Sequence, residues 1–365
     1  MKYHNRDEAV LLLADGTFFR GASIGKKGTS GGEICFNTGM TGYQEIYTDP
    51  SYYGQIMVNS TAHIGNYGVH PDEQESGKAK IFGLVVNRFS DQHSRINASE
   101  SLQGYMEANE LVGIAEIDTR MLVRHIRSKG AMNAIISTEI LDPEALMVEL
   151  KKVPDMEGLE LSSEVTTQEP YTLGEGNDKK VAVLDLGIKS SILKNLVERG
   201  CECKVFPAKS SYADMKAWGA DGYFISNGPG DPSAMDYAVN TVKEILSEDN
   251  PVFGICMGHQ ILARAVDIPT YKMHHGHRGI NHPVKNLESG LGEITSQNHG
   301  FAVSADELKA AEGVEVTHVN LNDQTIEGLK LTNKKAFSVQ YHPESSPGPH
   351  DSRYLFDKFV QLMNA

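Results

Sequence analysis

Residues 251–266 read PVFGICMGHQILARAV, in which a short apolar run passes directly into a segment with helical periodicity. The run is too short for a helix and is typical of a buried strand. Gly254 and Gly258 stand on either side of Cys256, and residues without side chains allow a sharp strand-to-helix turn to close. The stretch therefore predicts a strand, a tight turn and a helix, with a cysteine in place of serine at a nucleophile elbow.

Similar apolar runs lie along the chain from Lys180 onward. They alternate with helical stretches and include VAVLDLG, CECKVFP and DGYFISNG. Buried runs separated by amphipathic segments favour a mostly parallel sheet flanked by helices, and right-handed crossovers would make that sheet doubly wound. Ligands of such α/β folds bind beyond the carboxyl ends of the strands, so functional residues are expected there.

The rest of the chain has a different pattern. Residues 1–152 contain short alternating runs, many glycines and a helical stretch near 118–129, and are expected to form a mixed α/β domain. Residues 153–179 are rich in Glu, Thr, Gly and Pro, and are expected to be a linker that starts with a short helix. The α/β domain with the parallel sheet then occupies residues 180–365.

The composition is that of a folded, acidic protein. The formal net charge of −14 disfavours nucleic acid and anionic membranes as partners. The apolar run at residues 10–13 is too short for a signal-peptide core or a spanning helix, so a cytoplasmic protein is expected. Four cysteines do not make a disulfide framework in so long a chain, and they are expected to be thiols.

A thiol nucleophile needs a base, and the base needs a group that fixes its tautomer. Near the C-terminus, an apolar run ends in His342-Pro343-Glu344. Residues two apart in an extended segment share a face, so Glu344 could accept the imidazole N–H while the other nitrogen faces Cys256. His259 is a rival base because it lies close to Cys256 in sequence, but it should project along the following helix. The sequence therefore favours Cys256, His342 and Glu344 as nucleophile, base and orienting carboxylate.

Three segments in this order resemble the class I, or triad, glutamine amidotransferases: SNGPGDP (226–232), FGICMGHQ (253–260) and QYHPE (340–344). Six others look like the carbamoyl-phosphate synthase small subunit: FNTGMTGYQEIYTDPSYYGQ (36–55), HIGNYG (63–68), EIDTRMLVRHIR (116–127), GHRGINHPV (276–284), SQNHGFAV (296–303) and SPGPHD (346–351). The likeness covers nearly the whole chain, including the N-terminal domain, which other amidotransferases lack. It implies hydrolysis of the side-chain amide of L-glutamine by the three residues above.

The resemblance also implies a set of glutamine-contacting positions. Matched by motif, they are Ser51, Gly228, Gly230, Met257, Gln260, Asn298, Gly300 and Phe301. The first two glycines flank Pro229 after a predicted strand, where bare backbone amides can approach a carboxylate or a developing oxyanion. The sequence departs from the family at two places, since members often carry Leu where Met257 stands and Gly or Phe where Tyr341 stands. Met257 keeps its backbone N–H, and Tyr341 should affect packing more than chemistry.

The chain has no phosphate-binding loop of the form G-x-x-x-x-G-K-[ST]. The nearest segment, GASIGKK at 21–27, is one residue short. No cofactor is therefore expected on this chain. The resemblance implies a heterodimer with a large synthetase subunit, which would bind ATP with Mg²⁺ and make carbamoyl phosphate from the ammonia and bicarbonate, for arginine or pyrimidine biosynthesis.

A cluster of histidines raises the question of a metal. His274, His275 and His277 are neighbours, His282 follows, and imidazole binds zinc well. No cysteine or acidic ligand lies close to them in sequence, so no metal is expected. Because they fall in and beside the family-like stretch 276–284, a role in the subunit interface or in shaping the glutaminase site is favoured.

Two other functions remain open. The glutaminase component of another synthesis, such as anthranilate or guanylate formation, would share the triad domain but not the long N-terminal domain. A non-catalytic regulatory or scaffold subunit would keep the fold, but loss of Cys256 or His342 would then be expected, and both are present.

Overall fold

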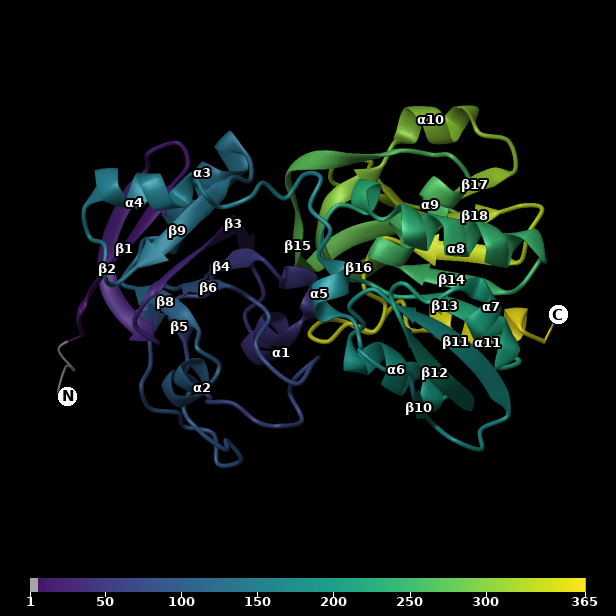
Figure 1. Cartoon of the computed structure of the whole chain (residues 1–365), viewed down its shortest axis with the longest axis horizontal. Helices are drawn as coiled ribbons and strands as arrows, with labels where there is room; N and C mark the ends of the chain where they lie inside the picture. Colours follow the sequence, from purple (N-terminus) through teal and green to yellow (C-terminus); the bar gives the residue numbers. More distant parts are fainter. Residues whose placement is uncertain (1–5, 365) are drawn as a thin grey trace. The chain divides into compact units, whose positions relative to one another are not determined.

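The structure is a computed structural model that describes residues 6–364. It divides into two compact units, Met1–Met156 and Glu157–Ala365, each with its own sheet (Figure 1). Each unit also has hydrophobic clusters of its own. The boundary between the units lies just beyond residue 152, where the N-terminal domain is predicted to end.

In the first unit, seven strands within residues 6–156 close into a barrel, so that none of the seven is left as a free edge. Three neighbouring pairs, β3–β4, β4–β6 and β6–β8, are parallel, and the others are antiparallel. In order around the barrel, the strands are β1 (Glu8–Leu13), β2 (Phe18–Gly25), β8 (Val112–Ala115), β6 (Gly83–Val85), β4 (Gln55–Asn59), β3 (Thr29–Asn37) and β9 (Asn133–Ser137).

Strand β1 is apolar along almost its whole length because both of its faces are buried. Leu11 and Leu13 join a hydrophobic cluster with side chains from strands around the barrel. Val10 and Leu12 join a second cluster with α4 (Pro143–Leu150), which packs on the other face. The remaining elements of this unit are α1 (Tyr43–Thr48), η1 (Pro50–Tyr52), β5 (His63–Ile64), β7 (Arg88–Phe89), α2 (Leu102–Ala108) and α3 (Thr119–Lys129).

Helix α3 confirms the helix expected near residues 118–129. It begins after Asp118, whose side chain accepts a hydrogen bond of 2.9 Å from the backbone N–H of Met121. A carboxylate in this capping position satisfies one of the free N–H groups at the start of a helix. The mixed α/β character predicted for the first part of the chain is therefore confirmed.

The second unit is built on a ten-stranded sheet within residues 157–364, and its parallel core matches the predicted α/β fold. The core contains four pairs of neighbouring parallel strands, β12–β11, β11–β13, β13–β14 and β14–β19. These strands are β11 (Lys179–Asp185), β12 (Cys201–Pro207), β13 (Gly222–Ile225), β14 (Val252–Ile255) and β19 (Ala336–Val339).

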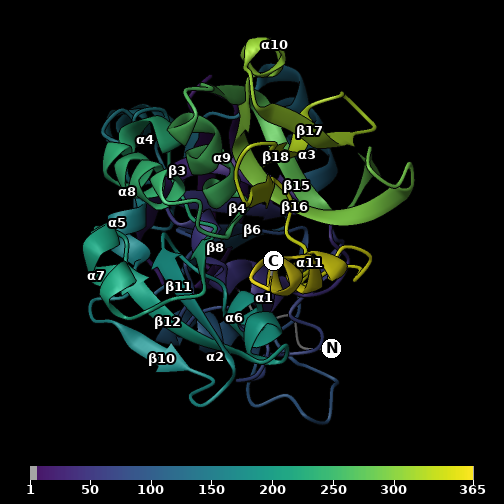
Figure 2. The ribbon, with the colours of Figure 1, turned by 90° about the vertical axis from the view of Figure 1, so that its right-hand side faces the viewer.

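Helices cover both faces of this core, as the apolar runs predict. Ala182 and Leu184 of β11 join a cluster with α7 (Tyr212–Ala217), α8 (Asp236–Ser247) and α9 (Met257–Ala265). Val181 and Val183 point to the opposite face and join a cluster with α6 (Ser190–Val197) and α11 (Tyr354–Leu362). Figure 2 shows this unit from the side, with α7 and α8 on one side of β11 and α6 on the other.

A group of antiparallel strands extends the parallel core, and this group was not expected from the sequence. It follows β19 in the order β18-β17-β15-β16, and its neighbours are all antiparallel. No long amphipathic helix lies between these strands, so short turns rather than crossovers connect most of them. Its elements are β15 (Thr270–Asn286), β16 (Gly292–Val303), α10 (Ala305–Ala310), β17 (Val314–Asn320) and β18 (Ile326–Leu331).

The segment predicted as a linker, 153–179, belongs mostly to the second unit. Its strand β10 (Tyr171–Leu173) pairs with β12 at the edge of the sheet, and its short helix α5 (Ser162–Val165) lies in the middle rather than at the start. Gly158 donates its N–H to Asp231 Oδ2 at 2.7 Å. Polar side-chain and backbone contacts of this kind leave no hydrophobic periodicity in the sequence, so the packing could not be read from it.

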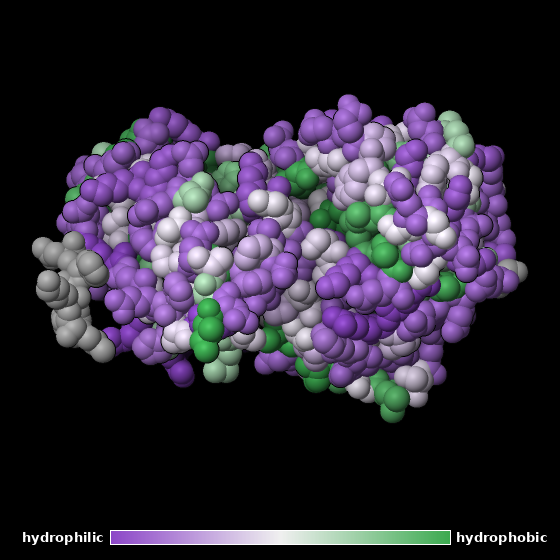
Figure 3. Space-filling view, turned by 90° about the horizontal axis from the view of Figure 1, so that it is seen from below, coloured by the Kyte–Doolittle hydropathy of each residue, from purple (hydrophilic) through white to green (hydrophobic). Residues whose placement is uncertain are grey.

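The surface and the thiols agree with the composition. Hydrophilic residues dominate the face of each unit seen in Figure 3. Within residues 6–364, every helix is too short or too polar to span a lipid bilayer. Cys35, Cys201, Cys203 and Cys256 are all buried, and none of them forms a disulfide.

Candidate active site

The cysteine at residue 256 lies at a strained turn between β14 and α9. Its backbone has φ 53° and ψ −102°, a conformation that costs a non-glycine residue about 1–3 kcal/mol. A Cβ atom at Gly258 would lie 2.1 Å from the Ile225 oxygen, and one at Gly254 would lie 2.6 Å from the Gly258 oxygen. The two glycines are therefore required for the turn, in agreement with the elbow predicted from the sequence.

His342 follows β19 and leaves the sheet at the same edge as Cys256. The two parallel neighbours β14 and β19 pair Ile255 with Val339, and the Cys256 N–H donates to the Val339 oxygen at 2.9 Å. His342 is fixed by its own backbone N–H, which donates to the Ser296 oxygen at 2.9 Å. Adjacent strands thus bring together two residues that are far apart in sequence.

Glu344 is paired with the imidazole of His342. The Nδ1 atom of His342 lies 2.7 Å from Glu344 Oε1, and both side chains are buried. Burial disfavours the imidazolium, but the Glu344 carboxylate and the Cys256 side chain outweigh it and raise the pKa of His342. The imidazole therefore holds a proton at neutral pH, with the thiol as a near neighbour.

The second ring nitrogen of His342 is the one available for chemistry. Nε2 is buried and has no hydrogen-bond partner within residues 6–364. The Cys256 thiol, which is 3% exposed, donates to the Asn298 oxygen at 3.5 Å. A sulfur, an unoccupied imidazole nitrogen and a carboxylate behind it form the arrangement that nucleophilic acyl transfer needs.

His259, the rival base, is turned into the core. Its Nδ1 atom lies 2.9 Å from Ser338 Oγ, on β19. Burial lowers the pKa of His259 to about 3, with His318 adding to the effect, so the ring is neutral at physiological pH. This contact is with a strand residue rather than with the thiol, as expected from the place of His259 on the helix.

Five predicted glutamine-contacting residues lie on α9, which follows this turn, and on β16, which meets the thiol at Asn298. Met257 begins α9, and its backbone N–H is one of those left without an intrahelical partner. Gln260 is buried and donates to the Phe301 oxygen at 2.8 Å and to Gln340 Oε1 at 3.0 Å. Its amide therefore links α9 to β16 and to the residue that follows β19. Asn298 contributes the carbonyl that accepts from the thiol, and Gly300 follows on the same strand.

Residues 226–231, called the glycine loop here, contain Gly228 and Gly230 and follow β13, which is paired with β14 in the sheet. A Cβ atom at Gly228 would lie 2.1 Å from the Leu186 oxygen, and Gly230 has a φ of +94°, so both positions need glycine. Tyr341 is buried in the cluster that includes α11, in agreement with a packing role. Ser51, the remaining predicted contact, lies on η1 in the first unit, and its contact with glutamine stays a prediction.

Lys189 is a site residue that the sequence analysis missed. It precedes α6, its side chain is 3% exposed, and its Nζ atom lies 2.8 Å from Glu344 Oε1. The signal in the sequence that could have indicated Lys189 is its position just after β11, because functional groups lie beyond the carboxyl ends of parallel strands.

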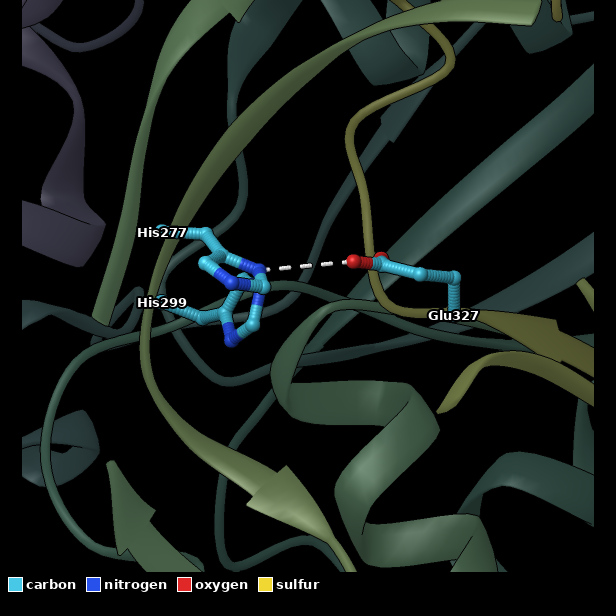
Figure 4. Close-up of side chains that lie close together, drawn as sticks. All are labelled: His277, His299 and Glu327. Carbon is cyan, nitrogen blue, oxygen red and sulfur yellow. Dashed lines mark ion pairs between the residues drawn. The ribbon is translucent and has the colours of Figure 1, made fainter. Parts of the chain in front are cut away.

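A second buried polar cluster lies in the antiparallel extension, where His277 of β15, His299 of β16 and Glu327 of β18 meet (Figure 4). Their ligand-type atoms all lie within 4.8 Å of one another. No acidic residue lies close to these histidines along the chain, but the sheet brings Glu327 within 3.4 Å of His277 Nδ1 and Asp323 within 2.7 Å of His277 Nε2. Acidic groups that are absent beside the histidines in the sequence are therefore close to His277 in space.

The donor atoms of this cluster already have protein partners. Glu327 accepts hydrogen bonds from Asn320 Nδ2 at 2.8 Å and from Gln297 Nε2 at 2.9 Å. His299 donates from Nδ1 to the Phe301 oxygen at 2.8 Å, and its Nε2 lies 2.9 Å from Gln297 Oε1. An ion bound here would have to displace these hydrogen bonds. The cluster instead joins β15, β16 and β18, and β16 is also the strand that carries Asn298.

Comparison with known families matches both parts of the chain. Residues 182–362 match the family described as "Glutamine amidotransferase class-I". Residues 11–136 match the family described as "Carbamoyl-phosphate synthase small chain, CPSase domain". The second match separates this chain from glutaminase components that serve other syntheses.

Relatives are similar over nearly their whole length. Proteins named carbamoyl phosphate synthase small chain are 47% identical in a Synechococcus species, over 100% of this chain and 95% of the relative, and 48% identical in Syntrophotalea carbinolica, over 98% of each. The protein of that name in Vibrio parahaemolyticus is 46% identical, over 97% of this chain and 98% of the relative. The chain therefore belongs to the carbamoyl phosphate synthase small chain family, and its second unit contains the class-I glutamine amidotransferase domain.

Proposed function

We propose that this chain is the glutamine-hydrolysing subunit of a carbamoyl-phosphate synthase, with Cys256, His342 and Glu344 as its catalytic residues. The observation that carries these roles is the buried His342–Glu344 pair, with 2.7 Å between Nδ1 and Oε1, beside the cysteine of the strained turn. Membership of the small chain family supports the reaction, and the geometry supports the roles of the individual residues.

The proposed reaction has two steps. In the first, His342 holds the proton that Cys256 has given up, and the Cys256 thiolate forms a bond to the side-chain carbonyl carbon of glutamine. The Nε2 proton of His342 then passes to the amide nitrogen as the C–N bond breaks and ammonia leaves. In the second, water attacks the thioester while His342 accepts a proton from it, the C–S bond breaks and glutamate is released. Glu344 stabilises the imidazolium throughout and holds its tautomer.

The substrate is proposed to lie at the carboxyl edge of the parallel core. The N–H groups at the start of α9, beginning with Met257, can donate to the oxyanion that forms in the first step. The glycine loop after β13 presents backbone groups at the same edge of the sheet. The positions proposed to contact glutamine are Ser51, Gly228, Gly230, Met257, Gln260, Asn298, Gly300 and Phe301.

The ammonia is proposed to pass to a large synthetase subunit in a heterodimer, in the cytoplasm. Ammonia in water at neutral pH is mostly protonated and is then no nucleophile, so a sheltered path between subunits suits the chemistry. The sequence contains no P-loop motif, which supports placing the sites for ATP and Mg²⁺ on the partner. Co-expression with that subunit, followed by analytical ultracentrifugation, tests whether the two chains form a one-to-one complex.

The central test compares serine variants of two buried cysteines in the complex with the large subunit. Cys256→Ser should lower glutamine-dependent carbamoyl phosphate synthesis by at least about 10³-fold, because a hydroxyl at neutral pH is a far weaker nucleophile than a thiolate. Synthesis from added ammonium salt should persist. Cys201→Ser, in β12, should retain glutamine-dependent activity. Normal glutamine hydrolysis by Cys256→Ser would refute the proposal.

A further inference from the structure

A buried lysine stands behind the proposed triad. Lys189 Nζ donates to Glu344 Oε1 at 2.8 Å and to the Ser346 oxygen at 2.9 Å. The side chains of Lys189 and Glu344 are 3% and 0% exposed. The ammonium therefore joins the start of α6 to the loop that carries the carboxylate and the proposed base, and it does so away from water.

The backbone around Lys189 is held in place by a dedicated set of hydrogen bonds. Asp185 Oδ1 accepts from the N–H groups of Gly187 at 2.9 Å and Ile188 at 2.8 Å. Asn227 Oδ1 accepts from the Lys189 N–H at 3.2 Å, and its amide donates to the Gly187 oxygen at 3.0 Å. The side chain thus extends from a fixed point, which is what a group needs if it is to position another.

The ammonium of Lys189 also offsets the free-energy cost of burying the Glu344 carboxylate. A buried carboxylate is costly unless it is paired, and removal of one partner of a buried pair leaves an uncompensated charge. Burial raises the pKa of Glu344, but Lys189 and His342 outweigh it and lower that pKa to about 2. Both partners meet the same oxygen, Oε1, whereas Oε2 has no partner within residues 6–364.

We propose that Lys189 is a positioning residue of the glutaminase site, whose ammonium holds Glu344 Oε1 against His342 Nδ1. It also keeps the carboxylate ionised, so that the proton shared between the two groups remains on the imidazole. Lys189 acts through Glu344 rather than on the substrate. This inference rests on the proposed function, since it matters for catalysis only if His342 is the base.

The charged groups that face Glu344 come from three places in the unit. Lys189 precedes α6, and His342 lies on the same loop as Glu344, with Cys256 beyond the imidazole. Arg353, just before α11, donates from Nη2 to the backbone oxygen of Glu344 at 3.2 Å rather than to the carboxylate. Of these, Lys189 is the positive group whose removal changes the carboxylate without touching the imidazole.

The first test replaces the ammonium by a methyl thioether of similar length. In the complex with the large subunit, Lys189→Met should lower kcat for glutamine hydrolysis about 10- to 100-fold, the usual scale for groups that orient a reacting residue. KM should change by less than about threefold, since no contact with glutamine is removed. The acid limb of the pH profile should move to higher pH, because a Glu344 without its cation takes up a proton more readily.

Two further variants guard against a merely structural effect. Lys194→Met removes an exposed lysine from α6, the helix that Lys189 precedes, and should leave kcat and the pH profile unchanged. Lys189→Arg keeps the positive charge, and its acid limb should stay at the wild-type position even if kcat falls. An arginine variant whose limb moves as far as that of Lys189→Met would overturn the proposal.

A double-mutant cycle gives the sharpest test. In a Glu344→Gln background, Lys189→Met should change kcat by less than about threefold, because the group through which the lysine acts is gone. The double variant also removes both buried charges together, so it is expected to fold where Lys189→Met alone fails. A full loss of kcat in this background would show that Lys189 acts through the Ser346 oxygen or the general fold, against the proposal.

The outcomes separate this inference from the proposed function. If the wild-type complex releases glutamate and Lys189→Met has the same kcat and pH profile as the wild type, only the proposed role of Lys189 is refuted. If the wild-type complex releases no glutamate, the proposed function fails and this inference fails with it.

Discussion

The second unit contains two buried histidines that face carboxylates, and they differ in what else surrounds the ring. His342 contacts Glu344 with one nitrogen, and its other nitrogen has no hydrogen-bond partner within residues 6–364. His277 faces a carboxylate with each nitrogen, Asp323 at 2.7 Å and Glu327 at 3.4 Å. Burial opposes the charge on both rings, but the carboxylates outweigh it and raise the pKa of each.

The comparison separates a catalytic arrangement from a structural one. A raised pKa and a carboxylate partner are common to both histidines, so neither feature identifies the base. The distinguishing features are the unoccupied Nε2 of His342 and the sulfur beside it. The ring of His277 lies between two carboxylates, one on β18 and one on the turn before it. The ring can therefore link β15 to β18 and to that turn, but it cannot pass a proton to a reacting atom.

The largest expected effect is the loss of activity in His342→Asn. Removal of the general acid and base should lower kcat for glutamine hydrolysis by about 10²- to 10⁴-fold, whereas Lys189 remains paired with the Glu344 carboxylate and limits the loss of unfolding free energy. Steady-state kinetics and chemical denaturation measure the two quantities. His350→Asn, at an exposed histidine nearby, is the matched control and should retain activity. If His342→Asn were destabilised but active, the comparison would be reversed.

A smaller effect, on stability, is expected for His277→Gln. This change leaves Glu327 buried without its cationic partner and should lower the free energy of unfolding by about 2–3 kcal/mol. Because the pKa of His277 is raised above its ordinary value of 6.5, the extra stability is fully present below pH 6.5 and is lost as pH rises through the folded-state pKa.

The difference in unfolding free energy between wild type and His277→Gln should therefore narrow as the pH is raised above 6.5. Urea denaturation at several pH values measures it, with His274→Gln, an exposed position of the same strand, as the control. A difference that grows with pH would mean that His277 is neutral in the folded protein.

The smallest effect is expected for Asp323→Asn. The Asp323 side chain is 42% exposed, so water screens its ion pair with His277. Loss of this pair should lower the free energy of unfolding by less than about 1 kcal/mol and weaken the pH dependence without removing it. An effect as large as that of His277→Gln would show that Asp323, and not the buried Glu327, is the main partner of the imidazole.

Much of the fold could be predicted because local patterns carry it. The apolar runs from Lys180 onward predict strands buried on both faces, and the two glycines around Cys256 predict the turn. The antiparallel extension could not be predicted in the same way. Residues 270–286 are rich in polar residues and histidine, and their strand pairing depends on partners elsewhere in the chain.

The candidate site could be predicted where one short segment holds both partners. His342 and Glu344 are two residues apart, and their contact follows from the extended backbone. Lys189 and Glu327 could not be found this way, because each meets its partner through the sheet rather than along the chain. Ionic contacts between distant segments leave no periodic signal, so the sequence shows the charged residues but not their pairing.

The short stretch that opens the second unit limits where the amidotransferase half can be cut from the chain. Asp231 donates its N–H to the Leu159 oxygen at 2.9 Å, and Glu160 forms an isolated bridge with Gly230. A fragment that starts at residue 180 would lose these supports of the glycine loop together with the edge strand β10, whereas one that starts at Glu157 would keep both. A fragment that contains only the amidotransferase half should therefore start before Leu159, although the parallel strands of the sheet start only with β11.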